Sequence, residues 1–506
     1  MLTSFSERSS SKSMLLLAAA SALLPAAFFM ITRVRRRKQL EKDLPPYPPG
    51  PKPSLLLGNI PDLSRVKKSG VTYLGNAYIE WTKTYGKVFS IIVPFTGRMI
   101  VVCDPKFAKE VLITKNYPKS SMYNTVAPLL GSESMVLLSG ERWAPKRRAF
   151  NPGFGPNFLK NMVGTMAEKL ERFIECIEED ISGEAGKGGV TDLLYRAQTF
   201  TSDVIVGVAF GEDWGGKNPH PARLWITQIT DLCKGMSIRL GTLLFGFRTK
   251  FLIRHYEKLL DQEMMNILER RLAAGVSDDS KDICSIAINQ LKDKDGNLSK
   301  ADKISITHQL KTFYFAGHDT TATAISWAIW SLSQHEEILR KVRAELNDHG
   351  IWRDLENPPT YEQLQHCTYL EAVLKETLRL YPPAGSGRYV EKLDETLGGY
   401  RVGGAHVFVS PYVIHRHPDL WKNPNDFRPD RFLDGSEGDL QEKFLPFMRG
   451  PRDCLGKYFA LLEAKLAVSA LIMRFDVECV DPNDEPVNQV TLVPKNGTKV
   501  RFSNRK

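Results

Sequence analysis

Hydrophobic and polar positions divide the chain into an apolar amino-terminal run, a short proline-rich stretch and a long body. Residues 14–32 hold no charged side chain. A helix of that length spans roughly 28 Å, close to the ~30 Å of a bilayer core. Basic residues follow at once: Arg33, Arg35, Arg36, Arg37 and Lys38. The pattern predicts a tail (1–13) and a transmembrane anchor (14–32), with the rest of the chain on the cytoplasmic side.

Two other readings of this terminus compete with an anchor. A cleaved signal peptide has small polar residues after its apolar run, whereas here the basic cluster follows. A transit peptide is rich in serine and poor in acids; the first thirteen residues hold six serines but also Glu7, and the spanning run follows directly. We therefore favour the uncleaved anchor.

The pattern beyond the anchor is mainly helical with a few strands. Residues 33–53 are basic and proline-rich and are expected to form a stiff linker to a body at 54–506. Strand-like runs at 87–93 and 99–102 fit a hairpin. From about 105 to 385 the periodicity is mostly helical.

Strand-like pieces return near the carboxyl end, at 399–409 and 490–502. No internal repeat is visible. The fold class expected is mainly α with a minor β-sheet lobe. Length alone, 506 residues, would suggest roughly three domains of ~150 residues.

The net charge of the chain limits the classes of partner that it is expected to bind. The net charge is +10, which suits an acidic partner protein or an anionic membrane surface. Apart from the amino-terminal cluster the surplus is diffuse, and no Lys/Arg block alternates with aromatic residues. We therefore expect no nucleic-acid binding.

The cysteines indicate a reducing compartment. There are seven, an odd number, and no pair has C-x-x-C spacing. A disulfide framework or a zinc site is therefore not expected. The positions are Cys103, Cys176, Cys233, Cys284, Cys367, Cys454 and Cys479.

Cys454 lies in a special setting, the segment 447–456 before a predicted helix at 457–474. A helix amino terminus stabilises a thiolate through its dipole and free N–H groups. Gly450 and Gly456 lack side chains that would hold off a flat cofactor, and Arg452 could pair with an anionic group. For the cysteine alone, a buried structural role would be the better reading.

The whole segment favours a cofactor ligand over a structural cysteine, because it resembles the haem-binding loop of the cytochrome P-450 superfamily. Phe447, Gly450, Arg452, Cys454 and Gly456 stand at the family's positions. The resemblance implies haem b as cofactor and Cys454 as its iron ligand, a thiolate that favours O–O cleavage. One departure is the methionine at 448, where the family usually has Gly or Ser.

A second segment, 316–321, lies in an apolar helical stretch at about 304–335. Glycine inside a helix costs ~1 kcal/mol relative to alanine, so a reason is expected. One reading is a kinked helix with threonines bonded to its own carbonyls. The segment also resembles the family's oxygen-activation motif. That implies room for dioxygen at Gly317 and proton delivery by Asp319 and Thr320.

Further motifs carry structural and haem-holding roles by resemblance. Glu376 and Arg379 match the family's Glu-x-x-Arg helix, and Arg431 comes from its partner segment, which implies a buried charged triad. Without the resemblance, such a pair would be a surface contact of ~0.2–0.5 kcal/mol. Trp143 and Arg147 match a Trp-x-x-x-Arg motif that holds a haem propionate.

Arg388 is a further propionate candidate.

The resemblance runs from about 45 to 502 and implies a single catalytic domain, in place of the three domains that length alone would suggest. It implies a haem-dependent monooxygenase that inserts one oxygen atom from O2 into a lipophilic substrate. Electrons would come from NADPH through a flavoprotein reductase, with a b-type cytochrome as an optional second donor, at the endoplasmic reticulum membrane. The pocket walls would come from 115–135, 205–250, 385–390 and the helix around Phe313 and Phe315.

Two other functions stay open. A haem-thiolate isomerase or dehydratase acting on a pre-oxidised substrate would not need the pair Asp319 and Thr320. A non-enzymatic haem-binding sensor would leave that pair unexplained.

Overall fold

The computed structural model describes residues 44–505, with gaps at 56, 69–72, 94–95, 184–188, 216–219, 239–241, 277–281 and 353–356. The anchor predicted at 14–32, with its tail and basic cluster, lies outside these residues. Within the part of the chain that is described, no helix has both the length and the apolar character that a membrane crossing requires.

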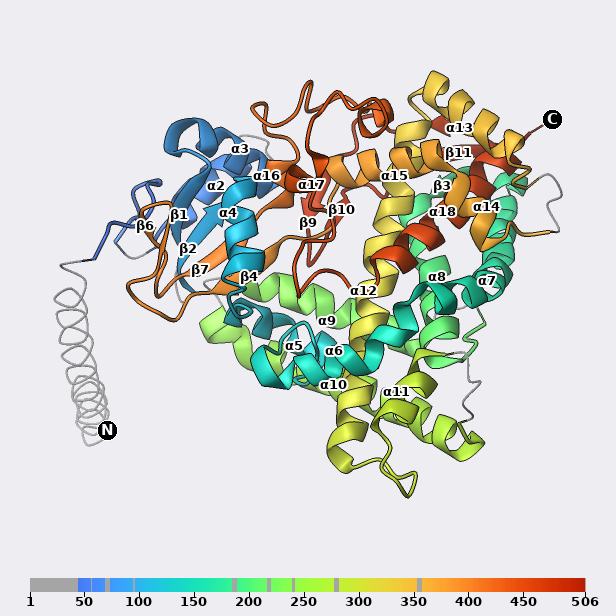
Figure 1. Cartoon of the computed structure of the whole chain (residues 1–506), viewed down its shortest axis with the longest axis horizontal. Coiled ribbons are helices and arrows are strands. Elements are labelled where there is room, and N and C mark those ends of the chain that lie inside the picture. The colour runs from blue at the N-terminus through green and yellow to red at the C-terminus, as the bar shows by residue number, and fades with distance from the viewer. Residues whose placement is uncertain are drawn as a thin grey trace, which may run out of the picture.

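Helices are the main secondary structure, as the hydrophobic pattern predicts (Figure 1). In the first half they are α2 (Ile60–Lys68), α3 (Leu74–Tyr85), α4 (Pro105–Lys109), α5 (Ala127–Leu130), α6 (Ala144–Phe150), α7 (Pro156–Ser182), α8 (Leu193–Ile205), α9 (Pro221–Ile238) and α10 (Thr242–Ala274). In the second half they are α11 (Ile283–Leu291), α12 (Lys300–Leu332), α13 (Glu336–Asp348), α14 (Tyr361–His366), α15 (Thr368–Leu380), α16 (Pro411–Ile414), α17 (Leu440–Lys443) and α18 (Lys457–Arg474).

The largest sheet forms a separate lobe, at the left of Figure 1. Its strand order is β1-β2-β7-β4, with bounds Val88–Val93, Gly97–Val102, His406–Val409 and Ser386–Tyr389. β1 and β2 form the predicted antiparallel hairpin, with Val88 opposite Val102. β2 then pairs in parallel with β7, so chain segments 300 residues apart complete one sheet.

Smaller sheets lie elsewhere. A three-stranded sheet joins β3 (Val190–Asp192), β11 (Lys499–Asn504) and β8 (Phe475–Cys479). Two-stranded pairs are β5 (Thr396–Leu397) with β6 (Tyr400–Arg401) and β9 (Pro486–Asn488) with β10 (Leu492–Pro494). The sequence pattern predicted the regions of β6, β7, β10 and β11 but missed β3, β4, β5, β8 and β9.

The proline-rich stretch is bonded to the sheet lobe rather than standing free. The Ser90 amide donates to the Pro49 carbonyl at 2.8 Å, and the Ser90 hydroxyl donates to that of Pro48 at 2.8 Å. The Tyr47 ring lies between the guanidinium groups of Arg98 and Arg401, at 4.1 and 4.6 Å. The second half of the linker predicted at 33–53 is therefore part of the folded body.

The main core surrounds α12, which runs through the middle of the helical part (Figure 1). A helix that is apolar all round its circumference is buried on every side. Ile325, Ala328 and Ile329 are fully buried here, and α12 packs against α8, α15 and α18. Because α18 follows Cys454, this packing sets the cysteine loop against the middle of α12.

Candidate functional site

The loop that carries Cys454 is fixed by its own backbone. The Cys454 amide donates to the Phe447 carbonyl at 3.0 Å, and the Asp453 amide donates to the Gly450 carbonyl at 3.1 Å. Gly450 has φ +80°, and a Cβ there would lie 2.7 Å from the Leu112 carbonyl oxygen. Only glycine fits that position without movement of the backbone.

Met448 is left-handed too, with φ +57°. Such a conformation is costly for a residue with a Cβ, which gives a physical reason for glycine to be usual at this position in the family. The Met448 side chain packs against the apolar cluster of the sheet lobe. Methionine in place of the family's usual Gly or Ser at 448 therefore strains the backbone but adds an apolar contact.

The Cys454 side chain opens into a cavity deep inside the protein, just before α18. Burial raises the pKa of the Cys454 thiol, whereas the backbone N–H of Gly456 and the charge of Arg147 act to lower it. Burial is the larger effect. The place of Cys454 just before α18 therefore does not by itself lower the pKa of the thiol.

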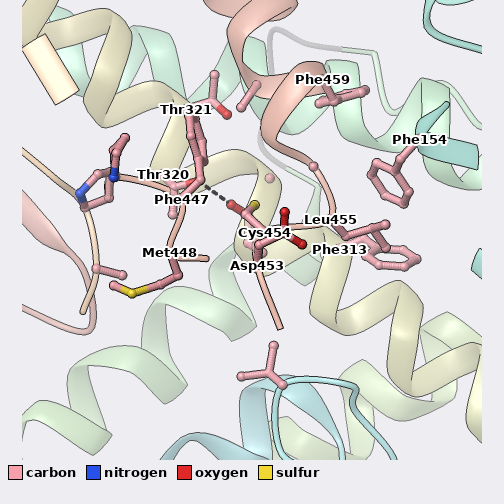
Figure 2. A pocket seen from close by; sticks show the side chains of 18 of the residues that line it. Phe154, Phe313, Thr320, Thr321, Phe447, Met448, Asp453, Cys454, Leu455 and Phe459 are labelled. Atoms are coloured by element: carbon pink, nitrogen blue, oxygen red, sulfur yellow. Dashed lines mark hydrogen bonds between the residues drawn. The ribbon is translucent and has the colours of Figure 1, made fainter. Parts of the chain in front are cut away.

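The cavity has a volume of about 360 Å³ and lies between the cysteine loop and α12. Figure 2 shows Thr320 and Thr321 on one side of Cys454 and the rings of Phe154, Phe313 and Phe459 on another. Apolar side chains dominate the lining: Met135, Val136, Phe154, Ile205, Phe313, Leu374, Leu378, Pro383, Ala384, Phe447 and Phe459. Of the wall regions expected from sequence, 205–250 contributes only Ile205 among the described residues, and Phe315 is not part of the lining.

The cavity face of α12 carries Ala316, Gly317 and Thr320. The Thr320 hydroxyl donates to the Ala316 carbonyl at 2.7 Å, as the helix-kink reading expects. Its oxygen lone pairs stay available as acceptors toward the cavity, so the two readings of this threonine are compatible. A Cβ on Gly317 would lie 3.0 Å from Ile205, so this glycine also allows α8 to pack closely against α12.

Three cations without acids lie together: Lys119 and Arg452 line the cavity, and a backbone bridge joins Arg388 to Lys119. Burial lowers the pKa of each, and mutual repulsion lowers further the pKa values of Lys119 and Arg452. None of the three has an ion pair within the described chain, and Nε and Nη2 of the buried Arg388 have no hydrogen-bond partner. Arg452 lies over the Trp143 ring, 4.4 Å from its centroid. Within the described residues, no negatively charged side chain neutralises these three cations.

Comparison with known proteins decides the family. The sequence profile described as Cytochrome P450 matches residues 48–502. The chain belongs to the cytochrome P450 family. It is similar to cytochrome P450 3A16 of Mus musculus, at 30% identity over 452 residues and 85% of each chain. It is also similar to cytochrome P450 4A24 of Sus scrofa, at 29% over 427 residues, which cover 80% of this chain and 82% of the relative.

A third relative is cytochrome P450 4V2 of Homo sapiens, at 28% identity over 424 residues and 78% of each chain. The chain is therefore an enzyme of the P450 monooxygenase class, and this class uses haem iron.

The residues of this P450 chain fit a haem. A haem is flat and apolar on its faces, and it carries two negatively charged propionates on one edge. The cavity offers an apolar lining, one thiol, and a group of buried cations that lacks acids. Lys119 belongs to that group and was missed from sequence, because no motif surrounds it.

Arg147 of the P450 chain is already paired. It donates to the Asp453 backbone carbonyl at 2.9 Å and to the Asp453 carboxylate at 3.0 Å. Arg147 also lines the cavity, so its predicted contact with a propionate stays a prediction beside its bonds to the cysteine loop. The predicted role of Trp143 as a propionate ligand is compatible with its place against Arg452.

Asp319 does not line the cavity. The amide nitrogen of Gln198 donates to one carboxylate oxygen at 3.0 Å, and the hydroxyl of Thr491 donates to the other. Both partners are far from Asp319 in sequence, so no motif could have shown them.

The structure brings together the three residues of the predicted charged triad. Arg379 donates to both oxygens of Glu376, at 2.7 and 2.9 Å, and Arg431 donates to one of them at 3.0 Å. All three side chains are fully buried. A second carboxylate, Glu437, pairs with Arg431 and was missed from sequence.

Proposed function

We propose that this P450 is a membrane-anchored monooxygenase that inserts one oxygen atom of O2 into a C–H or C=C bond of a lipophilic molecule, the other atom leaving as water. The observation that supports this most directly is the placement of Cys454 and Thr320 at one apolar cavity with unpaired cations at its edge. We assign 54–506 to one catalytic domain.

Residues of the chain would hold the cofactor as follows. Bound haem would supply the iron at which dioxygen binds and is cleaved, with Cys454 as the electron-donating thiolate. Arg452, Arg388 and Lys119 would bind the propionates: carboxylates would neutralise the three cations and would accept from Nε and Nη2 of Arg388, which have no partner. Trp143 would keep Arg452 in place by stacking.

Two residues of α12, Thr320 and Asp319, would deliver protons to the cavity. The Thr320 hydroxyl already donates to Ala316, so it can accept a hydrogen bond from water or an oxygen species in the cavity. Asp319 would supply the proton as a general acid after its carboxyl group has turned toward the cavity. The aromatic rings around Cys454 exclude bulk water and so limit loss of protons to side reactions.

The surroundings suit a membrane enzyme with an external electron donor. An apolar lining favours a lipophilic substrate. We assign the electrons to NADPH through a flavoprotein reductase, with a b-type cytochrome as an optional second donor. The anchor at 14–32 would place both at the endoplasmic reticulum membrane.

The test is the carbon-monoxide difference spectrum of the dithionite-reduced protein. We expect a strongly red-shifted Soret band, lost in Cys454→Ser and kept in the control Cys479→Ser, which changes a cysteine outside the cavity. A histidine-like band in folded wild-type protein would overturn the ligand assignment.

A second measurement separates the alternative functions. With NADPH, reductase and ¹⁸O2, a monooxygenase transfers one labelled atom to a product. Conversion of a pre-oxidised substrate without reductase would indicate an isomerase or dehydratase. Haem binding without any turnover would indicate a sensor.

A further inference from the structure

The Asp319 carboxylate is held by two neutral groups outside the cavity. Gln198 on α8 donates to Oδ1 at 3.0 Å, and Thr491, in the turn between β9 and β10, donates to Oδ2. Within the described residues Asp319 makes no ion pair, so these two hydrogen bonds are what fixes its side chain. We call this pair of bonds the Asp319 clamp.

The clamp faces away from the reacting side of α12. Successive residues of an α-helix point about 100° apart, since 3.6 residues make one turn. Ala316 and Thr320, four residues apart, line the cavity, whereas Asp319 does not. For Asp319 to pass a proton toward Thr320, its side chain must leave at least one partner of the clamp.

One partner of the clamp is connected to the cavity wall. Next to Thr491, the Leu492 amide donates to the Pro383 carbonyl at 2.8 Å. Pro383 lines the cavity together with Ala384 and Gly385. The cavity wall is therefore joined, through Pro383 and Leu492, to the segment that is bonded to Asp319.

The β9–β10 hairpin is small enough to respond. Each strand has three residues, and a two-stranded hairpin of this size has little stability of its own. Its position depends on its contacts with the rest of the fold, among them Pro383 and Asp319. Figure 1 shows β9 and β10 beside α12, and β10 contacts α12 directly.

We propose that Thr491 and Gln198 are positioning residues that hold Asp319 away from the cavity, and that a molecule filling the cavity releases the carboxyl group through Pro383 and the β9–β10 hairpin. This inference rests on the proposed function, because it concerns the acid assigned to proton delivery. The released carboxylate first takes a proton from solvent, then gives that proton to a water beside Thr320 and returns to the carboxylate form. Substrate occupancy would thus control proton delivery.

The first test needs no turnover. Hydrogen–deuterium exchange of residues 489–494 is measured in the haem-loaded full chain, with and without 4-phenylimidazole. The nitrogen of this probe binds haem iron, and its ring fills the cavity. We expect faster exchange with the probe in the wild type, and equally fast exchange without it in Thr491→Val.

Unchanged exchange in both cases would overturn the inference. A probe that causes no Soret shift would overturn the proposed function instead, because it would mean that no haem iron faces the cavity. The two failures are therefore distinguishable.

The second test measures NADPH oxidation with reductase and no added substrate. Thr491→Val and Gln198→Leu each remove one donor of the clamp, and we expect a rise of about five-fold, the equivalent of one net hydrogen bond. Thr491→Ser keeps the hydroxyl and should stay near the wild type. The rise should vanish in Thr491→Val combined with Asp319→Asn, because it needs the carboxyl group.

A matched control lies one turn along the helix. The Thr323 hydroxyl donates to the backbone carbonyl of Asp319 at 2.9 Å and does not touch the carboxylate. Thr323→Val makes the same chemical change as Thr491→Val, on the helix that carries Asp319, and should leave substrate-free oxidation unchanged. An equal rise in this control, or a rise that survives Asp319→Asn, would contradict the clamp.

Discussion

Buried cations occur in two different settings in this chain. Arg379 and Arg431 share Glu376, and Arg431 also has Glu437, so that cluster is neutralised by the protein itself. Lys119, Arg388 and Arg452 have no acid. A buried charge without a partner is costly. The first group therefore stabilises the fold, and the second group is suited to bind an anionic ligand.

Lys119 gives a pH-dependent prediction for the haem-free chain. Its folded pKa lies well below the ordinary value near 10.4 because of burial and the charges of Arg388 and Arg452. Between those two values the unfolded chain binds a proton that the folded chain lacks, so the free energy of unfolding rises with pH. Lys119→Met should flatten this rise and stabilise the chain most at the low end of the range.

The measurement is urea unfolding between pH 7 and 10, with Lys106→Met as the control at an exposed lysine. The control should follow the wild type. Equal slopes for the wild type and Lys119→Met would show that Lys119 is not desolvated in the folded protein.

Helix α12 acts both as core and as one wall of the site. Its apolar, buried second half made it the most predictable element: the sequence predicted about 304–335, and the helix runs from Lys300 to Leu332. Hydrophobic pattern determines which stretches become helices, because burial follows apolar surface. Gly317 and Thr320 line the cavity because they lie on α12, and Cys454 lines it because its loop leads directly into α18.

Side-chain partners were harder to predict. Asp319 bonds to residues 121 and 172 positions away, and Arg147 bonds to Asp453, 306 positions away. Such pairs depend on how elements pack and not on local sequence. Lys119 and Glu437 were missed for the same reason. The short strands β4 and β8 were missed because four or five residues carry too little alternation to stand out.

The charged triad joins elements on the proximal side of the core, since α15 supplies Glu376 and the segment before α17 supplies Arg431. Glu376→Gln leaves two buried guanidinium groups short of one negative charge. We expect a loss of about 3–5 kcal/mol in the free energy of unfolding.

Glu80→Gln is the matched control for the triad. Glu80 and Lys83 have the same three-residue spacing as Glu376 and Arg379, but both are well exposed. Exposed pairs contribute little, so this variant should not change stability measurably. Chemical denaturation of both variants, followed by circular dichroism, decides the matter. A small loss for Glu376→Gln would mean that the triad is more hydrated than its burial indicates.

The whole molecule has a basic surplus of +10, and part of it lies near the cysteine loop. Helix α6 carries Arg147, which bonds to Asp453 next to Cys454, and the adjacent Arg148 is exposed. An acidic electron donor that approaches this side would come close to Cys454. Charge complementarity at such a surface mainly speeds encounter.

Arg148→Glu should therefore slow association with the reductase, by about 3- to 10-fold at low salt, without changing the carbon-monoxide spectrum. The effect should shrink as salt rises toward 0.15 M, where the screening length is about 8 Å. Stopped-flow measurement of the first electron transfer at several reductase concentrations gives the association rate. Lys499→Glu makes the same charge reversal on β11, away from α6 (Figure 1), and serves as the control. Equal slowing by both variants would mean that only net charge matters and that the donor has no preferred face near Cys454.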